Sequence, residues 1–167
     1  LICLVLNKVT LEENISLISQ HRPFVDIVEL RIDYLKSEEA LQAARFPAMT
    51  DLPVILTCRR ADDGGQYRDS EKTRLALLEK ALDGDFAYVD IEEDVKRSVC
   101  VIKAQQKGIQ VIRSFHDFRQ VPDDLVHRMV QIARKGSIPK AAVMPSSIQD
   151  VKRLFEASRE LNSIEKK

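Results

Sequence analysis

Short apolar runs alternate with helical patterns six times along the chain. The runs are rich in Val, Ile, Leu and Phe, which favours β-strands. The predicted strands cover residues 1–7, 24–33, 53–60, 86–93, 109–116 and 137–145. Strands separated by helices at this spacing pair in parallel through right-handed crossovers. The pattern therefore predicts an α/β fold built on a parallel sheet.

The helical segments between these runs carry their own start and stop signals. Thr10 and Glu13 have the spacing of a capping box. Ser70 can cap a later helix in the same way. Three glycines each follow a helical run, as expected of helix ends: Gly84, Gly108 and Gly136. No linker rich in Pro, Gly or Ser interrupts the alternation, so we expect one domain over residues 1–167.

The alternation of side chains within the strands separates two architectures. Helices cover both faces of a doubly wound open sheet, so its central strands should be apolar on both faces. Here most strands have one polar and one apolar face, with Arg113 as an unexplained polar residue on an apolar face. The polar face carries Glu29, Arg31, Asp33, Thr57, Arg59, Asp90, Glu92, Ser114, His116 and Lys140. These residues gather toward the carboxyl ends of the strands, where (β/α)8 barrels place their sites, so we predict a TIM-type barrel with about six βα units in this chain.

Charge and cysteine content limit the kinds of partner. The 26 Lys and Arg balance the 26 Asp and Glu, so no excess of basic charge favours nucleic acid or an anionic membrane. The three cysteines lack metal-ligand spacing, which suits a reducing compartment. The apolar run at residues 1–6 is too short to span a bilayer and has no basic leader. We therefore expect a cytoplasmic protein with a small-molecule partner.

Lys140 is the residue that most needs a chemical explanation. It lies in SIPKAAVMP, where an ammonium would lose its water among apolar side chains. Desolvation, or a nearby cation such as Arg59, favours the neutral amine, which attacks carbonyl carbon. The alternative is a structural ion pair with Glu29 or Asp90. His116, at the end of the preceding strand on the same face, favours catalysis because histidine transfers protons near neutral pH.

Five segments together resemble one known family. They are VELRID (28–33), LTCRRADDGGQ (56–66), YVDIEE (88–93), SFHDF (114–118) and IPKAAVMPSSIQDV (138–151). They resemble type I 3-dehydroquinate dehydratase, the Schiff-base enzyme of the shikimate pathway, and the resemblance runs through all six predicted strands in order. The resemblance implies a βα barrel that dehydrates 3-dehydroquinate to 3-dehydroshikimate without a metal or an organic cofactor.

The resemblance also implies the catalytic residues. Lys140 matches the lysine that forms an iminium with the substrate ketone, and His116 matches the general acid and base. In the family a glutamate orients this histidine, and Asp63 stands at its position, one methylene shorter. The glycines at 64–65 lack the pattern of a phosphate-binding loop, so we expect a turn that brings Asp63 over the site.

Substrate binding is implied by two further matches. Glu29, Leu30 and Arg31 match the ELR triplet of the family, and Arg59 matches the arginine of its T-x-R motif. The D-x-E motif at residues 90–92 also matches, and we expect it to form ion pairs inside the barrel rather than to catalyse.

The sequence is also compatible with other functions and with an incomplete barrel. A Schiff-base aldolase would also use an inward lysine, but it usually needs a phosphate site, and the sequence shows none. A binding or structural fragment would keep Lys140 merely paired. A closed barrel of this class has eight strands against the six predicted here, so we expect the last two βα units to be missing and turnover to be slow. We also expect a homodimer.

Overall fold

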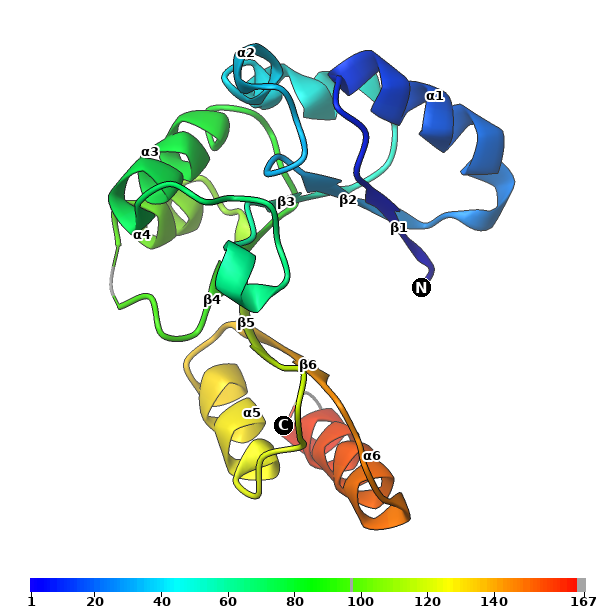
Figure 1. Ribbon diagram of the computed structural model, residues 1–167, viewed down its shortest axis with the longest axis vertical. Coiled ribbons are helices and arrows are strands. Elements are labelled where there is room, and N and C mark those ends of the chain that lie inside the picture. The colour runs from blue at the N-terminus through cyan, green and yellow to red at the C-terminus, as the bar shows by residue number, and fades with distance from the viewer. Residues whose placement is uncertain (97, 165–167) are drawn as a thin grey trace. The chain divides into compact units, whose positions relative to one another are not determined.

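The computed structural model describes residues 1–96 and 98–164 and shows strands alternating with helices (Figure 1). The elements are β1 (Cys3–Leu6), α1 (Leu11–His21), η1 (Arg22–Phe24), β2 (Ile27–Arg31), α2 (Ser37–Ala40), η2 (Ala43–Met49), β3 (Val54–Thr57), η3 (Ala61–Asp63), α3 (Glu71–Ala81), β4 (Tyr88–Glu92), α4 (Val99–Gln106), β5 (Gln110–Asp117), α5 (Leu125–Arg134), β6 (Ile138–Val143) and α6 (Ile148–Ile164). An observed strand lies at each of the six predicted positions, which confirms the predicted alternation.

The predicted strand at 24–33 is too long at both ends. The short helix η1 runs from Arg22 to Phe24, with Pro23 in its first turn, and takes Phe24 out of the strand. At the other end Tyr34 N donates to Arg31 O at 3.1 Å, so the chain turns directly after Arg31. The shorter strand leaves Asp33 in a turn rather than in the sheet.

The strands follow one another in the order β1-β2-β3-β4-β5-β6. The registers between β1 and β2, β2 and β3, β3 and β4, and β5 and β6 are all parallel. A doubly wound sheet reverses its strand order at a switch point, whereas a βα barrel keeps the order of the chain. The sheet therefore confirms the TIM-type class and excludes the open-sheet alternative.

The described residues fall into two compact units. Unit 1 consists of residues 1–91 and 95–111, and unit 2 consists of residues 92–94 together with the chain from residue 112 onward. Each unit has its own apolar core.

The core of unit 1 lies on the apolar face of its strands. Val28, Leu30, Ile32, Leu56 and Val89 are each at most 1% exposed. They belong to one cluster with apolar residues of the surrounding helices. The face of these strands that the sequence predicts to be apolar is thus the face that packs against helices, as in a βα barrel.

Side chains cap the N-termini of α1 and α3 in unit 1, as the sequence predicts. Thr10 and Glu13 form a complete capping box at α1, in which the Thr10 hydroxyl accepts from Glu13 N at 3.2 Å. The Ser70 hydroxyl accepts from Thr73 N at 3.2 Å at the start of α3. Each cap satisfies an amide that has no partner within the first helical turn, and so fixes where the helix begins.

Unit 2 packs α5 and α6 side by side against strands β5 and β6 (Figure 1). Phe115 and Ala141 from the strands join Leu125 of α5 and Ala157 of α6 in one cluster. Arg113, the polar exception on this face, turns its guanidinium to the backbone, where Nη2 donates to Glu93 O at 2.8 Å. The exception is therefore resolved by a hydrogen bond within unit 2.

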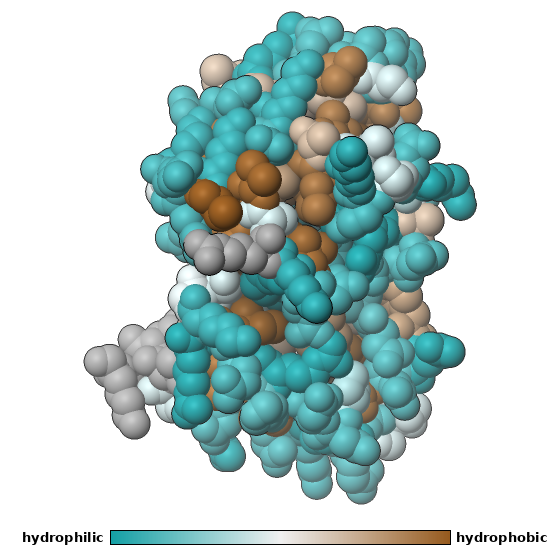
Figure 2. All heavy atoms as spheres, turned by 90° about the vertical axis from the view of Figure 1, so that its left-hand side faces the viewer, coloured by the Kyte–Doolittle hydropathy of each residue, from teal (hydrophilic) through white to brown (hydrophobic). Residues whose placement is uncertain are grey.

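The surface is mostly hydrophilic on the face shown in Figure 2, with hydrophobic side chains between the hydrophilic ones. Leu41, Val99 and Ile102 of unit 1 are among the exposed hydrophobic residues. No helix among residues 1–96 and 98–164 is both long enough and apolar enough to cross a membrane.

Candidate active site

The polar face of the strands in unit 1 forms a network of buried charges. Thr57 Oγ1 donates to Glu29 Oε1 at 2.8 Å. Arg59 Nη2 lies 2.7 Å from Asp90 Oδ2, and the two side chains are only 4% and 0% exposed. Burying an ion is costly unless a partner compensates it, so these contacts explain how the sheet tolerates charges on this face. Of the D-x-E motif that is expected to form ion pairs inside the barrel, Asp90 is thus seen to pair, with Arg59.

Arg31 and Asp33 form a bidentate pair at the carboxyl end of β2. Arg31 Nε donates to Asp33 Oδ1 at 2.9 Å, and Nη2 donates to Oδ2 at 2.7 Å. Partial burial lowers the pKa of Arg31, but the hydrogen bonds to Asp33 and the negative charge of Glu29 outweigh it, so the pKa is raised overall. The guanidinium also lies over the ring of Tyr34, 4.9 Å from its centroid. Arg31 is therefore a fixed cation.

The loop after β3 makes the turn that the sequence predicts. Gly64 directly follows the short helix η3 and has a φ of +79°. The next residue closes the turn, since Gly65 N donates to Arg60 O at 2.8 Å. Asp63 pairs with Arg60, whose Nε donates to Asp63 Oδ2 at 2.6 Å. In unit 1 the carboxylate of Asp63 is thus held by a neighbouring arginine of its own loop.

The strand register in unit 2 relates the predicted lysine and histidine. Ser114 pairs with Lys140, and His116 pairs with Ala142 in the parallel ladder of β5 and β6. Side chains two residues apart in a strand share a face, so Lys140, Ser114 and His116 lie on one face of this ladder. The opposite face carries Phe115, Ala141 and Val143, which pack with α5 and α6. The lysine and the histidine therefore face away from the helices of unit 2.

Hydrogen bonds tie the ends of β5 and β6 together. The Asp117 carboxylate accepts from Arg119 N at 3.0 Å and from Gln120 N at 3.2 Å, and Met144 N donates to Asp117 O at 3.1 Å. The backbone hydrogen bond from Arg119 is the main cause of a lowered pKa at Asp117. Asp117 thus shapes the turn that directly follows His116.

A second carboxylate fixes the start of α6, directly after β6. Asp150 Oδ2 accepts from Ser146 N at 2.9 Å and from Ser147 N at 3.0 Å. In return Asp150 N donates to Ser147 Oγ at 3.1 Å, which completes a reciprocal cap. These bonds, the one from Ser146 N above all, lower the pKa of Asp150 well below the usual range.

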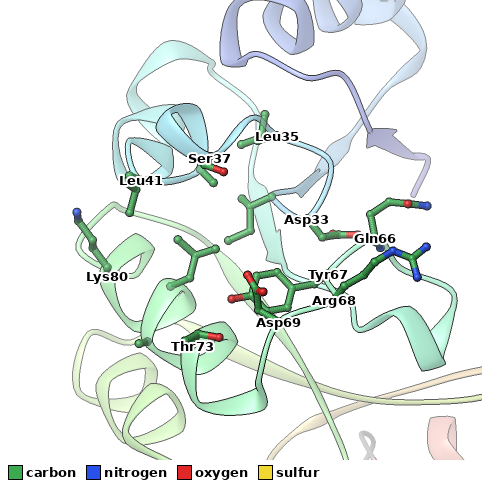
Figure 3. Close-up of a pocket in the computed structure, with 14 residues that line it drawn as sticks. Asp33, Leu35, Ser37, Leu41, Gln66, Tyr67, Arg68, Asp69, Thr73 and Lys80 are labelled. Carbon is green, nitrogen blue, oxygen red and sulfur yellow. Dashed lines mark hydrogen bonds between the residues drawn. The ribbon is translucent and has the colours of Figure 1, made fainter.

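A cavity in unit 1 is separate from these predicted residues. It has a volume of about 630 Å³ and lies in unit 1, beside α2 and α3 (Figure 3). Its walls are mostly apolar, with Leu35 and Leu41 on one side and Tyr67 on another. None of the residues predicted to bind substrate or to catalyse lines it, although Asp33 does. Among the described residues, no cluster of three or more His, Cys, Asp and Glu side chains could hold a metal ion.

A parallel βα sheet in chain order, with buried polar residues along one face of its strands, places the protein in the βα-barrel class. A family model described as type I 3-dehydroquinase matches residues 2–167. The chain belongs to the type I 3-dehydroquinase family. It is therefore an enzyme of the lyase class, a 3-dehydroquinate dehydratase.

Two similar proteins are described as 3-dehydroquinate dehydratases, the activity of this family. A 3-dehydroquinate dehydratase of Methanocaldococcus jannaschii is 30% identical over 163 residues, which are 93% of this chain and 72% of that protein. A 3-dehydroquinate dehydratase of Lactococcus lactis subsp. cremoris is 30% identical over 162 residues, which are 95% of this chain and 69% of that protein.

Solved structures of 3-dehydroquinate dehydratases also resemble this chain. The 3-dehydroquinate dehydratase from Enterococcus faecalis has a TM-score of 0.83 at 25% identity, covering 95% of this chain and 72% of that one. The type I enzyme from Clostridium difficile, solved with covalently modified comenic acid, also has a TM-score of 0.83, at 27% identity, covering 97% of this chain and 70% of that one.

Leu30 differs from the two predicted substrate-binding residues beside it. Its side chain is 0% exposed in the core of unit 1, on the opposite face from Glu29 and Arg31, so only the backbone of Leu30 is left to contact a substrate on the polar face. Two further residues with contacts near the predicted site have no role predicted from the sequence. Asp33 holds Arg31, and Arg74 donates from Nη1 to Cys58 O at 2.6 Å, beside Arg59. The alternation places Asp33 on the polar face but gives no sign of these contacts.

Proposed function

We propose that the chain dehydrates 3-dehydroquinate through a Schiff base on Lys140, with His116 as general acid and base. The observation that carries the proposal is the register of β5 and β6, in which Lys140 pairs with Ser114, two residues before His116. Neighbouring strands lie about 4.8 Å apart and two residues span about 6.6 Å, so the two Cα atoms are about 8 Å apart. A flexible lysine and an imidazole on one face can therefore reach the same substrate.

The proposed chemistry begins with the lysine amine. Its nitrogen adds to the ketone carbon, and loss of water leaves a cationic iminium, which acidifies the adjacent carbon. His116 removes a proton there, and an enamine forms. The protonated imidazole then gives its proton to the departing β-hydroxyl, which leaves as water. Hydrolysis of the iminium releases 3-dehydroshikimate and restores the amine. The covalently modified comenic acid in the Clostridium difficile relative supports a covalent route for this chain.

Substrate binding is proposed for the polar face of unit 1. Arg31 supplies a fixed cation, and Arg59 supplies a second, buried one. Glu29 is held by Thr57 and can accept hydrogen bonds from substrate hydroxyls. A dehydroquinate carboxylate and its hydroxyls match this set of donors and acceptors. Asp63 is proposed to orient His116, as the family resemblance implies.

Borohydride trapping tests the proposed nucleophile directly. Incubation with dehydroquinate and borohydride, followed by peptide mass mapping, should give a reduced adduct on Lys140. Lys140→Ala should abolish both trapping and turnover. Lys140→Arg should fail as well, because a guanidinium stays charged and cannot attack the ketone.

Two further variants sharpen this experiment. Lys152→Ala, at an exposed position on α6 in the same unit, is the matched control and should leave trapping unchanged. His116→Ala should still form the iminium but stop the elimination, so a trappable adduct accumulates. An adduct on another lysine in the folded protein, or near-normal dehydration by His116→Ala, would contradict the assignment.

We propose that the protein is a cytoplasmic homodimer and that residues 1–167 belong to a single βα-barrel domain. Sedimentation equilibrium measures the dimer: a species of about 38 kDa is expected from twice the 19.0 kDa chain mass. A purely monomeric species over the accessible concentration range would refute it.

A further inference from the structure

Asp33 has more hydrogen-bonding contacts than a simple partner of Arg31 would need. Its Oδ1 accepts from Arg31 Nε at 2.9 Å and from Arg59 N at 3.2 Å. Its Oδ2 accepts from Arg31 Nη2 at 2.7 Å and from Gln66 N at 3.0 Å. The side chain is 0% exposed. Each carboxylate oxygen thus receives two N–H donors, one from Arg31 and one from a backbone amide more than 25 residues away.

These bonds join three separate pieces of unit 1. Arg31 ends β2, Arg59 follows β3, and Gln66 lies in the loop after η3. Figure 3 shows Asp33 beside this loop, at the edge of the cavity. The side chain of Arg59 is held separately, by Asp90. One carboxylate therefore orients the guanidinium of Arg31 and at the same time fixes the backbone from which Arg59 extends.

We propose that Asp33 is a positioning residue that sets the geometry of both substrate-binding arginines. The inference rests on the proposed function for the roles of Arg31 and Arg59, but the contacts of Asp33 do not depend on it. Asp33 does not need to touch substrate. It acts because a carboxylate with four donors in fixed directions leaves Arg31 and the Arg59 backbone little freedom before substrate arrives.

Asp33→Asn is the sharpest variant because it keeps the size and shape of the side chain. An amide has one acceptor oxygen, so in either orientation its NH2 group faces two N–H donors. Asp51→Asn is the matched control, since Asp51 binds Arg22 with the same bidentate geometry, at 3.2 and 2.7 Å, but with a side chain 72% exposed. An exposed pair of this kind contributes little to stability.

Hydrogen exchange tests the contacts without reference to function. In Asp33→Ala, the amides of Arg59 and Gln66 should exchange roughly 10- to 100-fold faster than in the unmodified chain, because each loses a hydrogen bond to a charged acceptor. The amides of α1 should exchange as before. Unchanged exchange at both Arg59 and Gln66 would overturn the structural part of the inference, whatever the activity of the chain.

Steady-state kinetics test the positioning role. Asp33→Asn should raise the KM for dehydroquinate by about 10- to 100-fold, with a smaller fall in kcat, while the Asp51→Asn control keeps both. A purely structural role predicts less folded enzyme with unchanged KM, and that result would overturn the inference. If the unmodified chain neither binds nor dehydrates dehydroquinate, the proposed function fails, while the exchange measurement still decides the contacts.

Chemical rescue uses the cavity next to Asp33. In Asp33→Ala the lost carboxylate leaves space beside a cavity of about 630 Å³, through which a small anion can enter. Added formate should lower the KM of this variant and slow exchange at Arg59, whereas formamide, of the same size but without charge, should not. Equal effects of formate on Asp33→Ala and on the unmodified chain would contradict the requirement for a carboxylate at this position.

Discussion

Gly65→Ala tests whether the loop after β3 must pack directly on the backbone of Arg59. Gly65 is buried, and a methyl group built on it would overlap the carbonyl oxygen and carbon of Arg59 and lie 2.6 Å from its Cβ. Gly65 does not have a positive φ, so the obstacle is space rather than backbone conformation. Backbone cannot rotate away like a flexible side chain, so the whole loop has to move.

The cost follows from the contacts that this movement breaks. Overpacking alone costs about 1 to 3 kcal/mol. The methyl group would press directly on two of the hydrogen bonds that hold the loop, those from Gly65 N to Arg60 O at 2.8 Å and from Tyr67 N to Arg59 O at 3.2 Å. Each contributes about 1 kcal/mol. The free energy of unfolding should therefore fall by about 3 to 5 kcal/mol, which lowers the Tm by roughly 6 to 20 °C for a chain of this size.

The matched control is Gly108→Ala. Gly108 has a φ of +73°, and a methyl group on it would have no atom within 4 Å, so only the left-handed backbone penalises alanine. That penalty is about 1 to 2 kcal/mol, or roughly 2 to 8 °C. Thermal unfolding and urea titration of both variants measure the difference. A Gly65→Ala variant as stable as Gly108→Ala, with normal KM, would refute the view that close packing of the loop positions Arg59.

Two further predictions concern carboxylates of unit 2. Asp117→Ala removes the acceptor for Arg119 N and Gln120 N, so the turn after His116 should loosen and kcat should fall by about 10- to 100-fold. Asp117→Asn can still accept these hydrogen bonds and should retain most activity in the same assay. The pKa of Asp150 is lower in the folded than in the unfolded chain, so the unfolded chain binds more protons in acid. The stability that Asp150 contributes is present above pH about 4 and is lost as the pH falls below it. Urea midpoints measured against pH should show a smaller acid loss in Asp150→Asn, and equal slopes would contradict this.

Much of the fold follows from the sequence because strand alternation is a local property. Side chains alternate between faces with a period of two, so Val28, Leu30 and Ile32 must lie opposite Glu29 and Arg31 whatever the rest of the chain does. The capping box of α1 is equally local, since Thr10 and Glu13 are three residues apart. Such signals identify the elements and the polar face without any long-range contact.

The environment of a residue is harder to predict from the sequence where it depends on distant segments. Arg74 lies three residues after Glu71, a spacing typical of an exposed pair on a helix. In the structure Arg74 is 0% exposed, donates to Cys58 O at 2.6 Å and binds Glu71 at 2.7 and 2.8 Å. Only the packing of α3 against the end of β3 turns a surface charge into a buried support. No local pattern predicts η2 for the same reason, because Phe46 is buried by tertiary packing and not by a periodic pattern.

The candidate site shows the same division between local and long-range information. The strand pattern put Arg31, Asp33 and Arg59 on one face, and a family motif accounts for two of them. Asp33 stands beyond the end of β2 and gains its role from amides at Arg59 and Gln66, which reach it only when the loop after β3 folds back. The same loop requires a residue without a side chain at Gly65, so that its backbone can lie against Arg59. Placing the arginines is therefore a property of the loop and of Asp33 together, and a substitution in either should disturb substrate binding before it disturbs the sheet.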